Sequence, residues 1–173
     1  MESSFLIVAG LSLLGLTVRT GYELLKKAGK VDPHNRAVFA TVFVAMGVML
    51  ASWPVMGPRD PWRIALPAFA RWIGLGGAGA GLALAIGGLV QLRGVENIDH
   101  LVTTGLYARL RHPIYLGFIL WIFGWTAANG AILSLAVGLA AIANILYWRH
   151  LEERALESSY GTAYRLYRQA TWF

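Results

Sequence analysis

Residues 114–148 read IYLGFILWIFGWTAANGAILSLAVGLAAIANILYW, and these 35 residues without a charge decide the fold. As one helix they would be about 52 Å long, against a hydrocarbon core of about 30 Å, so the chain must fold back within them. Asn129-Gly130 lies near the middle and is the strongest turn signal of the stretch. The sequence therefore predicts a hairpin of two membrane spans, Ile114 to Ala128 and Ala131 to Trp148.

Three further apolar stretches precede this hairpin. They run from Phe5 to Leu25, from Ala37 to Trp53 and from Trp72 to Leu92. Within the first, Arg19 is expected to extend to the membrane surface, and Pro54 is expected to end the second. Seven glycines in the third would be costly in a soluble helix, so they predict close packing against another span. A cleaved signal peptide is disfavoured because Glu2 stands where a basic segment would be.

The composition agrees with a membrane protein. Of 173 residues, 57% are apolar and 14% are charged, and the mean hydropathy is +0.54. This excludes a disordered chain, and the net charge of +6 fits loops at an anionic membrane face better than a nucleic-acid surface. With no cysteine and four scattered histidines, the sequence predicts no metal site.

Beyond Trp148 the helical pattern continues with charges. Arg149, Glu153, Leu156, Tyr160, Tyr164 and Tyr167 share one stripe, which predicts an amphipathic helix in water. The predicted fold is therefore all-α: a polytopic membrane protein of about five transmembrane helices, with a tight hairpin at 114–148 and a cytoplasmic C-terminal helix. We treat 1–173 as a single membrane domain, with two spans and a loop in 1–70 and the core in 71–173.

The distribution of basic residues predicts the orientation. Twelve of the 15 Lys and Arg fall in or near the 26–36 loop, the 93–113 loop and the C-terminal tail, which lie on one side. Only Arg59, Arg63 and Arg71 are on the other. The positive-inside rule then places the N-terminus outside and the C-terminus in the cytoplasm.

The polar residues gather in two segments, Glu96 to Tyr115 and Arg149 to Tyr167, which flank the hairpin and therefore meet at one membrane face. Taken alone, His112-Pro113 predicts only a helix start, and Glu152-Glu153 predicts only a solvent-exposed helix face. However, Arg149 and Glu153 stand four apart on one helical face opposite this turn. Together these segments predict a site for a zwitterion or a carboxylate.

Four motifs in this order carry a resemblance that covers about half of the chain, from Gln91 onward. They are DHLVTTGLY (99–107), RHPIYLG (111–117), Arg149 with Glu152-Glu153, and YGxxYxxY (160–167). The chain resembles the integral-membrane methyltransferases typified by isoprenylcysteine carboxyl methyltransferase. Such relatives usually have Phe where Tyr160 stands and a Pro-rich segment after the last tyrosine, so we expect a less covered pocket here.

The resemblance implies that S-adenosylmethionine binds on the cytoplasmic side. The residues that it assigns to the cofactor are Gln91, His100, Leu101, Val102, Tyr107, His112, Pro113, Ile114, Tyr115 and Glu153. It places Arg149 facing the methyl acceptor. This fits the chemistry, because the amino-acid end of the cofactor needs a histidine, a tyrosine hydroxyl and a carboxylate.

The acceptor and the reaction class leave alternatives. A prenylcysteine-like carboxylate is favoured opposite Arg149 because it is ionised at pH 7 and needs no general base, whereas an amine or a thiol would need one, for which Glu152 is the candidate. A hydrophobic acceptor is expected to enter from the bilayer. The competing hypotheses are a membrane sterol reductase that uses NADPH and a non-catalytic scaffold. Pro113-Ile114-Tyr115 favours methyl transfer, because sterol reductases tend to have Asn-Tyr there.

Overall fold

The computed structural model describes residues 2–32, 35–92 and 101–173. Regular structure in these residues is helical. The α-helices are α1 (Glu2–Lys27), α2 (Arg36–Met56), α3 (Ala68–Leu92), α4 (Pro113–Asn129) and α5 (Ile132–Ala170), and the 3-10 turns are η1 (Gly57–Arg59) and η2 (Gly105–Ala108). The predicted all-α fold is confirmed.

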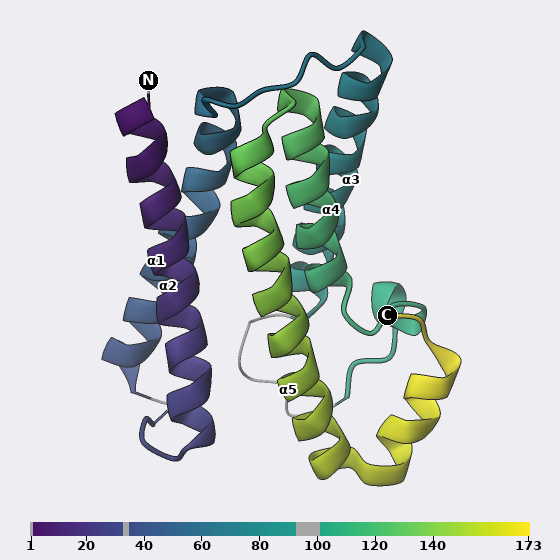
Figure 1. The fold of residues 1–173 in the computed structure, drawn as a ribbon. Helices are drawn as coiled ribbons and strands as arrows, with labels where there is room; N and C mark the ends of the chain where they lie inside the picture. Colours follow the sequence, from purple (N-terminus) through teal and green to yellow (C-terminus); the bar gives the residue numbers. More distant parts are fainter. Residues whose placement is uncertain (1, 33–34, 93–100) are drawn as a thin grey trace.

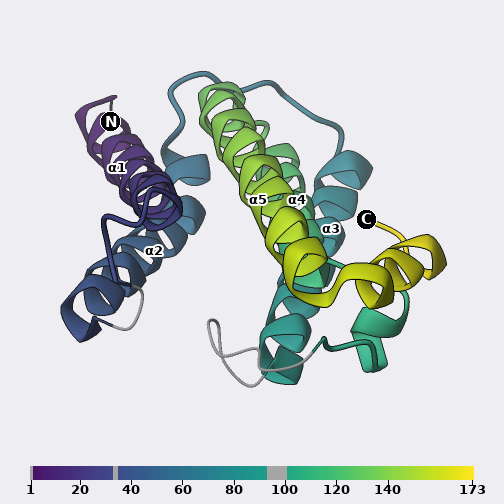
Figure 2. The same cartoon turned by 90° about the horizontal axis from the view of Figure 1, so that it is seen from below.

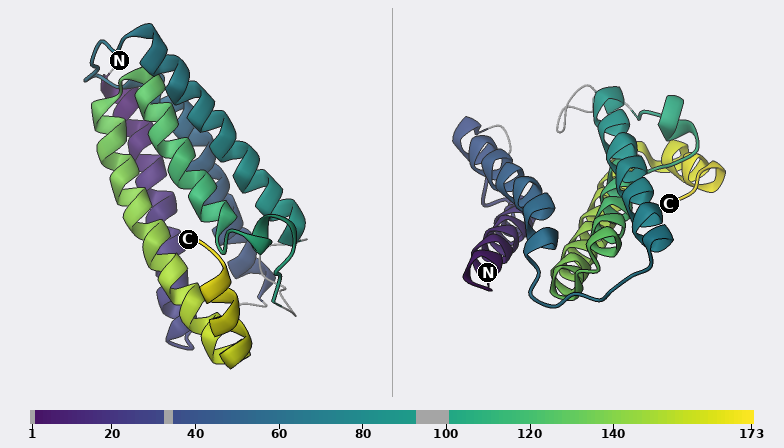
Figure 3. Two further views of the ribbon diagram at one scale, coloured as in Figure 1. Left: turned by 90° about the vertical axis from the view of Figure 1, so that its right-hand side faces the viewer. Right: turned by 90° about the horizontal axis from the view of Figure 1, so that it is seen from above.

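The helices form two groups, which are clearest when the molecule is seen along the bundle (Figure 2). One group is α1 with α2, and the other is α3 with α4, with α5 lying beside α4 and contacting α1 (Figures 1 and 3). The end of α1, the start of α2 and the described segment 101–112 before α4 lie at the same end of the bundle as the C-terminus (Figure 1). This is the arrangement that the counting of basic residues assumed.

The predicted membrane spans are present. Helices α1, α2, α3 and α5 are long and apolar enough to cross a membrane. Helix α4 has 17 apolar and uncharged residues, about 26 Å, and packs between α3 and α5. Together they make the chain an integral membrane protein. Helix α5 is longer than a membrane needs, and the part from Arg149 onward carries the charged residues of the tail.

Helices α3 and α4 approach each other closely, as the glycines of α3 predicted. A β-carbon on Gly81 would lie 2.5 Å from the carbonyl oxygen of Gly117, and one on Gly74 would lie 2.6 Å from the amide nitrogen of Ala128. Side chains at these positions would force the two backbones apart. Small residues therefore fix how α3 supports the start of α4, where the polar site begins.

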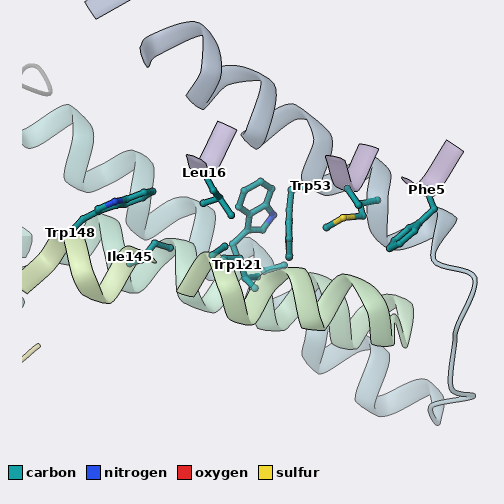
Figure 4. Packing of buried hydrophobic residues seen from close by; sticks show 11 residues of the cluster. Phe5, Leu16, Trp53, Trp121, Ile145 and Trp148 are labelled. Atoms are coloured by element: carbon teal, nitrogen blue, oxygen red, sulfur yellow. The ribbon is translucent and has the colours of Figure 1, made fainter. Parts of the chain in front are cut away.

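Large side chains fill the space between the two groups of helices. Trp53 from α2 and Trp121 from α4 meet edge to face, with ring centroids 6.4 Å apart. Leu16 from α1 and Ile145 and Trp148 from α5 extend this cluster toward the end of the bundle that carries the C-terminus (Figure 4). The cluster joins α1 to the hairpin just inside the membrane from the polar residues.

The turn between α4 and α5 is close to the predicted position. Gly130 has φ +60°, and a β-carbon there would collide with the carbonyl oxygen of Ile64, so both the turn and the close approach require glycine. Asp60 lies beside this turn, almost fully buried, and accepts from the backbone amides of Trp62 (2.8 Å) and Ser134 (2.6 Å). This carboxylate fastens the loop before α3 to the first turn of α5.

Two boundaries differ from the prediction. Pro54 does not end the second span, because α2 continues to Met56; the hydroxyl of Ser52 bonds the carbonyl of Met49 in the turn that the proline weakens. The third span begins at Ala68 rather than Trp72. Arg71 is accommodated in this extra turn because its Nε donates to the carbonyl of Ala128, 3.1 Å away.

The predicted stripe along the C-terminal helix is interrupted. Gly161 has φ 51° and ψ −119°, so the helix breaks there and the rest of the tail turns back toward the segment before α4 (Figure 1). The prediction that Tyr164 continues the stripe of Glu153 was therefore wrong, because it assumed an unbroken helix through this glycine. Instead, Tyr164 folds inward and is fully buried.

Candidate functional site

The candidate site is built around the carboxylate of Glu153, just beyond the membrane-spanning part of α5. Its Oε1 atom lies 3.3 Å from Nε2 of His112, 3.4 Å from Nε of Arg111 and 3.3 Å from Nη2 of Arg149. Two of these side chains come from the segment before α4 and one from α5 itself. The hairpin thus brings the two predicted polar segments together. All three contacts use the same oxygen, Oε1.

A second carboxylate lies on the other side of His112. Glu152 Oε2 is 3.8 Å from Nδ1 of His112, and Tyr115 is near enough to act on the pKa of the Glu152 carboxyl, which burial raises. The rings of His112 and Tyr115 are stacked, with centroids 5.6 Å apart. His112 is therefore held between two adjacent glutamates and against one tyrosine, all of them residues that the sequence singled out.

The protonation state of His112 follows from its surroundings. Burial, with Arg149 and Arg111 nearby, lowers the pKa of His112 to about 4, although Glu153 acts in the opposite direction. The imidazole is then neutral at pH 7. Because an ionised carboxylate can only accept, Nε2 carries the hydrogen toward Glu153 and Nδ1 is the unprotonated nitrogen. The charges at Glu153 are thus its own carboxylate and the two arginines.

Arg111 ties the tail to this cluster. While its Nε faces Glu153, its Nη1 donates to the carbonyl oxygens of Arg168 (3.0 Å) and Thr171. One guanidinium therefore bridges α5 and the returning tail. Because Arg111 contacts both, the position of the tail depends on the Glu153 cluster, and the geometry of the cluster depends on the position of the tail.

The end of the tail pairs with the segment before α4 along the backbone. The amide of Trp172 donates to Arg109 (2.9 Å), the amide of Arg111 donates to Trp172 (3.0 Å), and that of His112 donates to Phe173 (3.2 Å). These bonds place the tail over the histidine, which is only 4% exposed. The expectation of a less covered pocket is not met in this structure.

Phe173 lies directly on Arg149. The guanidinium carbon is 4.5 Å from the centre of the ring, a cation–π contact that leaves the in-plane N–H groups available. The Nε of Arg149 and the hydroxyl of Tyr164 are both buried without a hydrogen-bond partner in the described part of the chain. Buried donors of this kind mark where a ligand is expected to supply acceptors.

The remaining predicted residues lie around the site rather than in it. Gln91 accepts from the amide of Leu106 (2.9 Å) and so holds the η2 turn, and the hydroxyl of Tyr107 donates to the carbonyl of Gly88 in α3 (3.4 Å). Pro113 and Ile114 both pack near Gly88. Leu101 and Val102 lie half-buried in the extended segment before η2, and His100 lies outside the described residues.

Several residues of the site were missed as site residues. Arg111 is part of the RHP motif, and a basic residue beside a histidine at a helix start was a usable signal. Tyr164, Thr171 and Phe173 reach the cluster only because Gly161 turns the chain. No spacing rule for an unbroken helix would have found them.

Fold and site together define a class: a polytopic helical membrane protein with a mostly buried cluster of charged side chains at one end of its helix bundle. Residues 82–163 match the family model described as phospholipid methyltransferase. The protein-S-isoprenylcysteine O-methyltransferase of Schizosaccharomyces pombe is 35% identical over 81 residues, which is 43% of this chain and 32% of that protein. No solved structure matches the chain significantly.

These matches support the resemblance: residues 82–163 are similar to the phospholipid methyltransferase family and to a protein-S-isoprenylcysteine O-methyltransferase. The matched segment contains α4, most of α5 and the Glu153 cluster. The chain spans about a third of the length of the curated relative, at 32%. Helices α1 and α2 lie outside the family match.

Proposed function

We propose that this protein transfers a methyl group from S-adenosylmethionine to a lipophilic acceptor at the cytoplasmic face of the membrane. The observation that carries this proposal is the Glu153 cluster, which joins the RHPxY segment and the Arg149-x-x-Glu152-Glu153 segment at the end of the membrane-spanning hairpin. The family match covers both segments. The division into two N-terminal spans and a core from residue 71 belongs to the same proposal.

The side chains present fit the amino-acid end of the cofactor. The carboxylate of Glu153 can accept from its ammonium, and the unpartnered hydroxyl of Tyr164 can donate to its carboxylate. Neutral His112 and Tyr115 provide a stacked, apolar wall beside them. Bound S-adenosylmethionine supplies a sulfonium methyl group for in-line displacement. The residues of this chain then act by aligning the reactants and excluding water.

Arg149 and Glu152 are the residues that face the acceptor in this proposal. A carboxylate acceptor needs no base at pH 7 and is held by a guanidinium, which favours a prenylcysteine-like group. An amine or a thiol would have to lose a proton, and Glu152, beside Tyr115 and His112, is placed to take it. The match to a methyltransferase family favours methyl transfer over a membrane reductase or a scaffold.

Equilibrium binding of labelled S-adenosylmethionine to the detergent-solubilised protein tests the proposal. We expect saturable binding that S-adenosylhomocysteine competes and NADPH does not. Competition by NADPH would instead support the reductase hypothesis, and absence of binding to folded protein would support the scaffold.

The orientation is tested separately. The proposal places the C-terminus and the site in the cytoplasm, where the methyl donor is made. A reporter fused after Phe173 should therefore behave as cytoplasmic and one inserted near Pro61 as external. The opposite labelling would place the site on the wrong side of the membrane and contradict the proposed reaction.

Arg149→Lys tests the role of the arginine. Lysine keeps the charge but loses the planar guanidinium, which can bind a carboxylate through two parallel N–H groups. Because this contact is made to the acceptor, we expect a large loss of turnover with near-normal cofactor affinity. If Arg149 serves only to orient Glu153, its partner at 3.3 Å, cofactor affinity will fall together with turnover. Arg154→Lys, an exposed change on the same helix, is the matched control and should alter neither.

A further inference from the structure

The end of the tail exposes a large aromatic side chain that the proposed function does not use. Trp172 is 64% exposed, although its backbone bonds to Arg109 and to Arg111 hold it in place. The ring of its neighbour Phe173, with a centroid 5.7 Å from that of Trp172, packs on Arg149. Trp172 therefore lies beside the residue that covers the site, and its own indole faces the surroundings of the protein.

The position of Trp172 relative to the membrane follows from Arg149. This arginine is the first charged residue after the uncharged hairpin, so it marks where α5 leaves the membrane. Its guanidinium carbon is 4.5 Å from the ring centre of Phe173. The C-terminus accordingly lies near the level where α4 begins and at the side of the α3–α4–α5 group (Figures 1 and 2). A bilayer that surrounds the spans has its headgroup layer beside Trp172.

Trp172 also has the chemistry of a residue at a membrane interface. Tryptophan is enriched there because its ring is apolar while its indole N–H needs a hydrogen-bond acceptor. At the other end of the bundle, Trp62 in the loop before α3 and Trp72 in α3 are 64% and 72% exposed. Trp172 is their counterpart at the end that carries the site, but it reaches the headgroup layer through the tail and not through a span.

Basic side chains flank Trp172. Arg109, whose carbonyl accepts from the Trp172 amide at 2.9 Å, and Arg168, four residues before Trp172, both have exposed side chains. The carbonyl of Arg168 accepts from Nη1 of Arg111 at 3.0 Å, so this exposed charge belongs to the part of the tail that is fastened to the Glu153 cluster. Arginine is attracted to anionic headgroups and can bind phosphate through two N–H groups. This part of the surface therefore complements an anionic lipid surface in charge.

We propose that the end of the tail docks on anionic phospholipid headgroups, with the indole of Trp172 in the headgroup layer and with Arg109 and Arg168 on lipid phosphates. The membrane then helps to hold the tail over the Glu153 cluster, because the docked segment also carries Phe173 and the carbonyls that bind Arg111. This inference does not depend on the reaction that the site performs. The alternative is that Trp172 lies in water and that protein contacts alone hold the tail.

The location of the tail can be measured with a spin label, because the chain has no cysteine and a single one can be introduced. The full chain is placed in nanodiscs of phosphatidylcholine, alone or mixed with phosphatidylglycerol. A label on Ala170→Cys, an exposed position near Trp172, should become more accessible to lipid-dissolved oxygen when phosphatidylglycerol is present. Labels on Leu139→Cys, exposed on the membrane-spanning part of α5, and on Glu157→Cys, exposed beyond it, are the lipid and water references.

Hydrogen exchange measures whether the membrane holds the tail. The amides of Trp172, Arg111 and His112 make the backbone bonds between the tail and the segment before α4. One arginine at an anionic surface changes an equilibrium by about fivefold, so these amides should exchange at least about fivefold more slowly with phosphatidylglycerol than without it. High salt should remove this difference, because it screens charges at a surface.

Two variants separate the lipid contacts from the protein contacts. R109Q/R168Q keeps the backbone bonds of the tail and should abolish the effect of phosphatidylglycerol, whereas Arg154→Gln, an exposed arginine of α5, should keep it. Trp172→Ser should speed exchange of the tail amides in both membranes. Its matched control is Trp62→Ser, which removes an equally exposed indole at the other end of the bundle and should leave these amides unchanged.

Equal exchange of the tail amides in the two membranes, or an effect of phosphatidylglycerol that survives in R109Q/R168Q, would overturn the inference. A label on Ala170→Cys that is as accessible to a water-soluble nickel complex as one on Glu157→Cys, in both membranes, would also overturn it, because the tail would then lie in water.

Discussion

Asp60 at one end of the helix bundle and Glu153 at the other are both mostly buried carboxylates, but they have different kinds of partners. Asp60 accepts from the backbone amides of Trp62 and Ser134 at 2.8 and 2.6 Å. Glu153 contacts the side chains of Arg111, His112 and Arg149 at 3.3 to 3.4 Å. Backbone amides of a turn and a helix start cannot be exchanged without unfolding them, whereas long side-chain contacts can be rearranged for a ligand.

The comparison separates a structural carboxylate, Asp60, from Glu153, the carboxylate that we propose binds the cofactor. A buried carboxylate stabilises the fold where, as at Asp60, its partners are neutral backbone amides of a turn and its hydrogen bonds are short. A buried carboxylate is suited to ligand binding where, as at Glu153, its partners are side chains from two segments and hydrogen-bond donors without a partner lie nearby. Substitutions at one end at a time should therefore change either stability or ligand affinity.

Asp60→Ala should have the largest effect, and only on stability. The amides of Trp62 and Ser134 would be left buried without an acceptor, a loss of about 3 to 4 kcal/mol in the free energy of unfolding. Asp60→Asn keeps one acceptor oxygen and should lose less. Detergent or thermal unfolding measures the loss, and the folded fraction should bind S-adenosylmethionine as before. A large change in that affinity would show that the two ends are coupled.

The sequence revealed one of these ends much better than the other. The Glu153 end was predictable because RHPxY and Glu152-Glu153 flank an uncharged hairpin, and folding the hairpin brings them together. Asp60 lies in the proline-rich loop between α2 and α3, where no motif singles it out. Its role depends on where the α4–α5 turn lies in space, and local pattern does not encode that.

The helices were predictable to within a turn because apolar length and Gly130 determine them. The tail was not, because its path depends on one backbone conformation at Gly161. The inward direction of Arg19 was also missed, since it depends on Trp148 and Glu23 rather than on the position of Arg19 along the helix.

The His112 imidazole should make stability depend on pH at the site end. The unfolded chain takes up a proton as pH falls through the ordinary value of 6.5, while the folded protein keeps His112 neutral until its pKa of about 4. The contribution is thus complete above pH 6.5 and is lost as pH falls toward 4, by up to about 3 kcal/mol. Unfolding measured across this range should show the slope.

Two variants identify the source of that slope. His112→Gln should flatten it, because the titrating group is gone. His150→Gln changes an exposed histidine of α5 and should leave it as it was. An unchanged slope in His112→Gln would assign the acid sensitivity to other groups.

Glu153→Gln should weaken the site while sparing the fold. The amide keeps the shape but loses the charge that a cofactor ammonium and two arginines require, so we expect the dissociation constant for S-adenosylmethionine to rise about 30-fold, near 2 kcal/mol. Glu157→Gln removes an exposed carboxylate one turn further along and should leave the affinity unchanged. Equal affinities in both variants would refute the assignment of the site.

Gly161→Ala should give the smallest effect, and it tests whether the tail completes the site. The φ of 51° and ψ of −119° suit glycine alone, but a β-carbon there meets nothing within 4 Å, so the cost is that of the backbone conformation, about 1 to 2 kcal/mol. Gly76→Ala, also in open space but in an ordinary helix, should be neutral or slightly stabilising.

The loss at Gly161 should be local, because the tail is held to the segment before α4 by a few backbone bonds and by Arg111. The amides of Arg111 and His112, which donate to Trp172 and Phe173, should exchange hydrogen faster, while the amides of α3 and α4 stay protected. With the ring of Phe173 displaced from Arg149, affinity for the cofactor should fall only a few-fold, in proportion to the open fraction. If exchange at these amides rises and affinity does not change, the tail covers the site without contributing to it, and the binding groups are those of the hairpin ends alone.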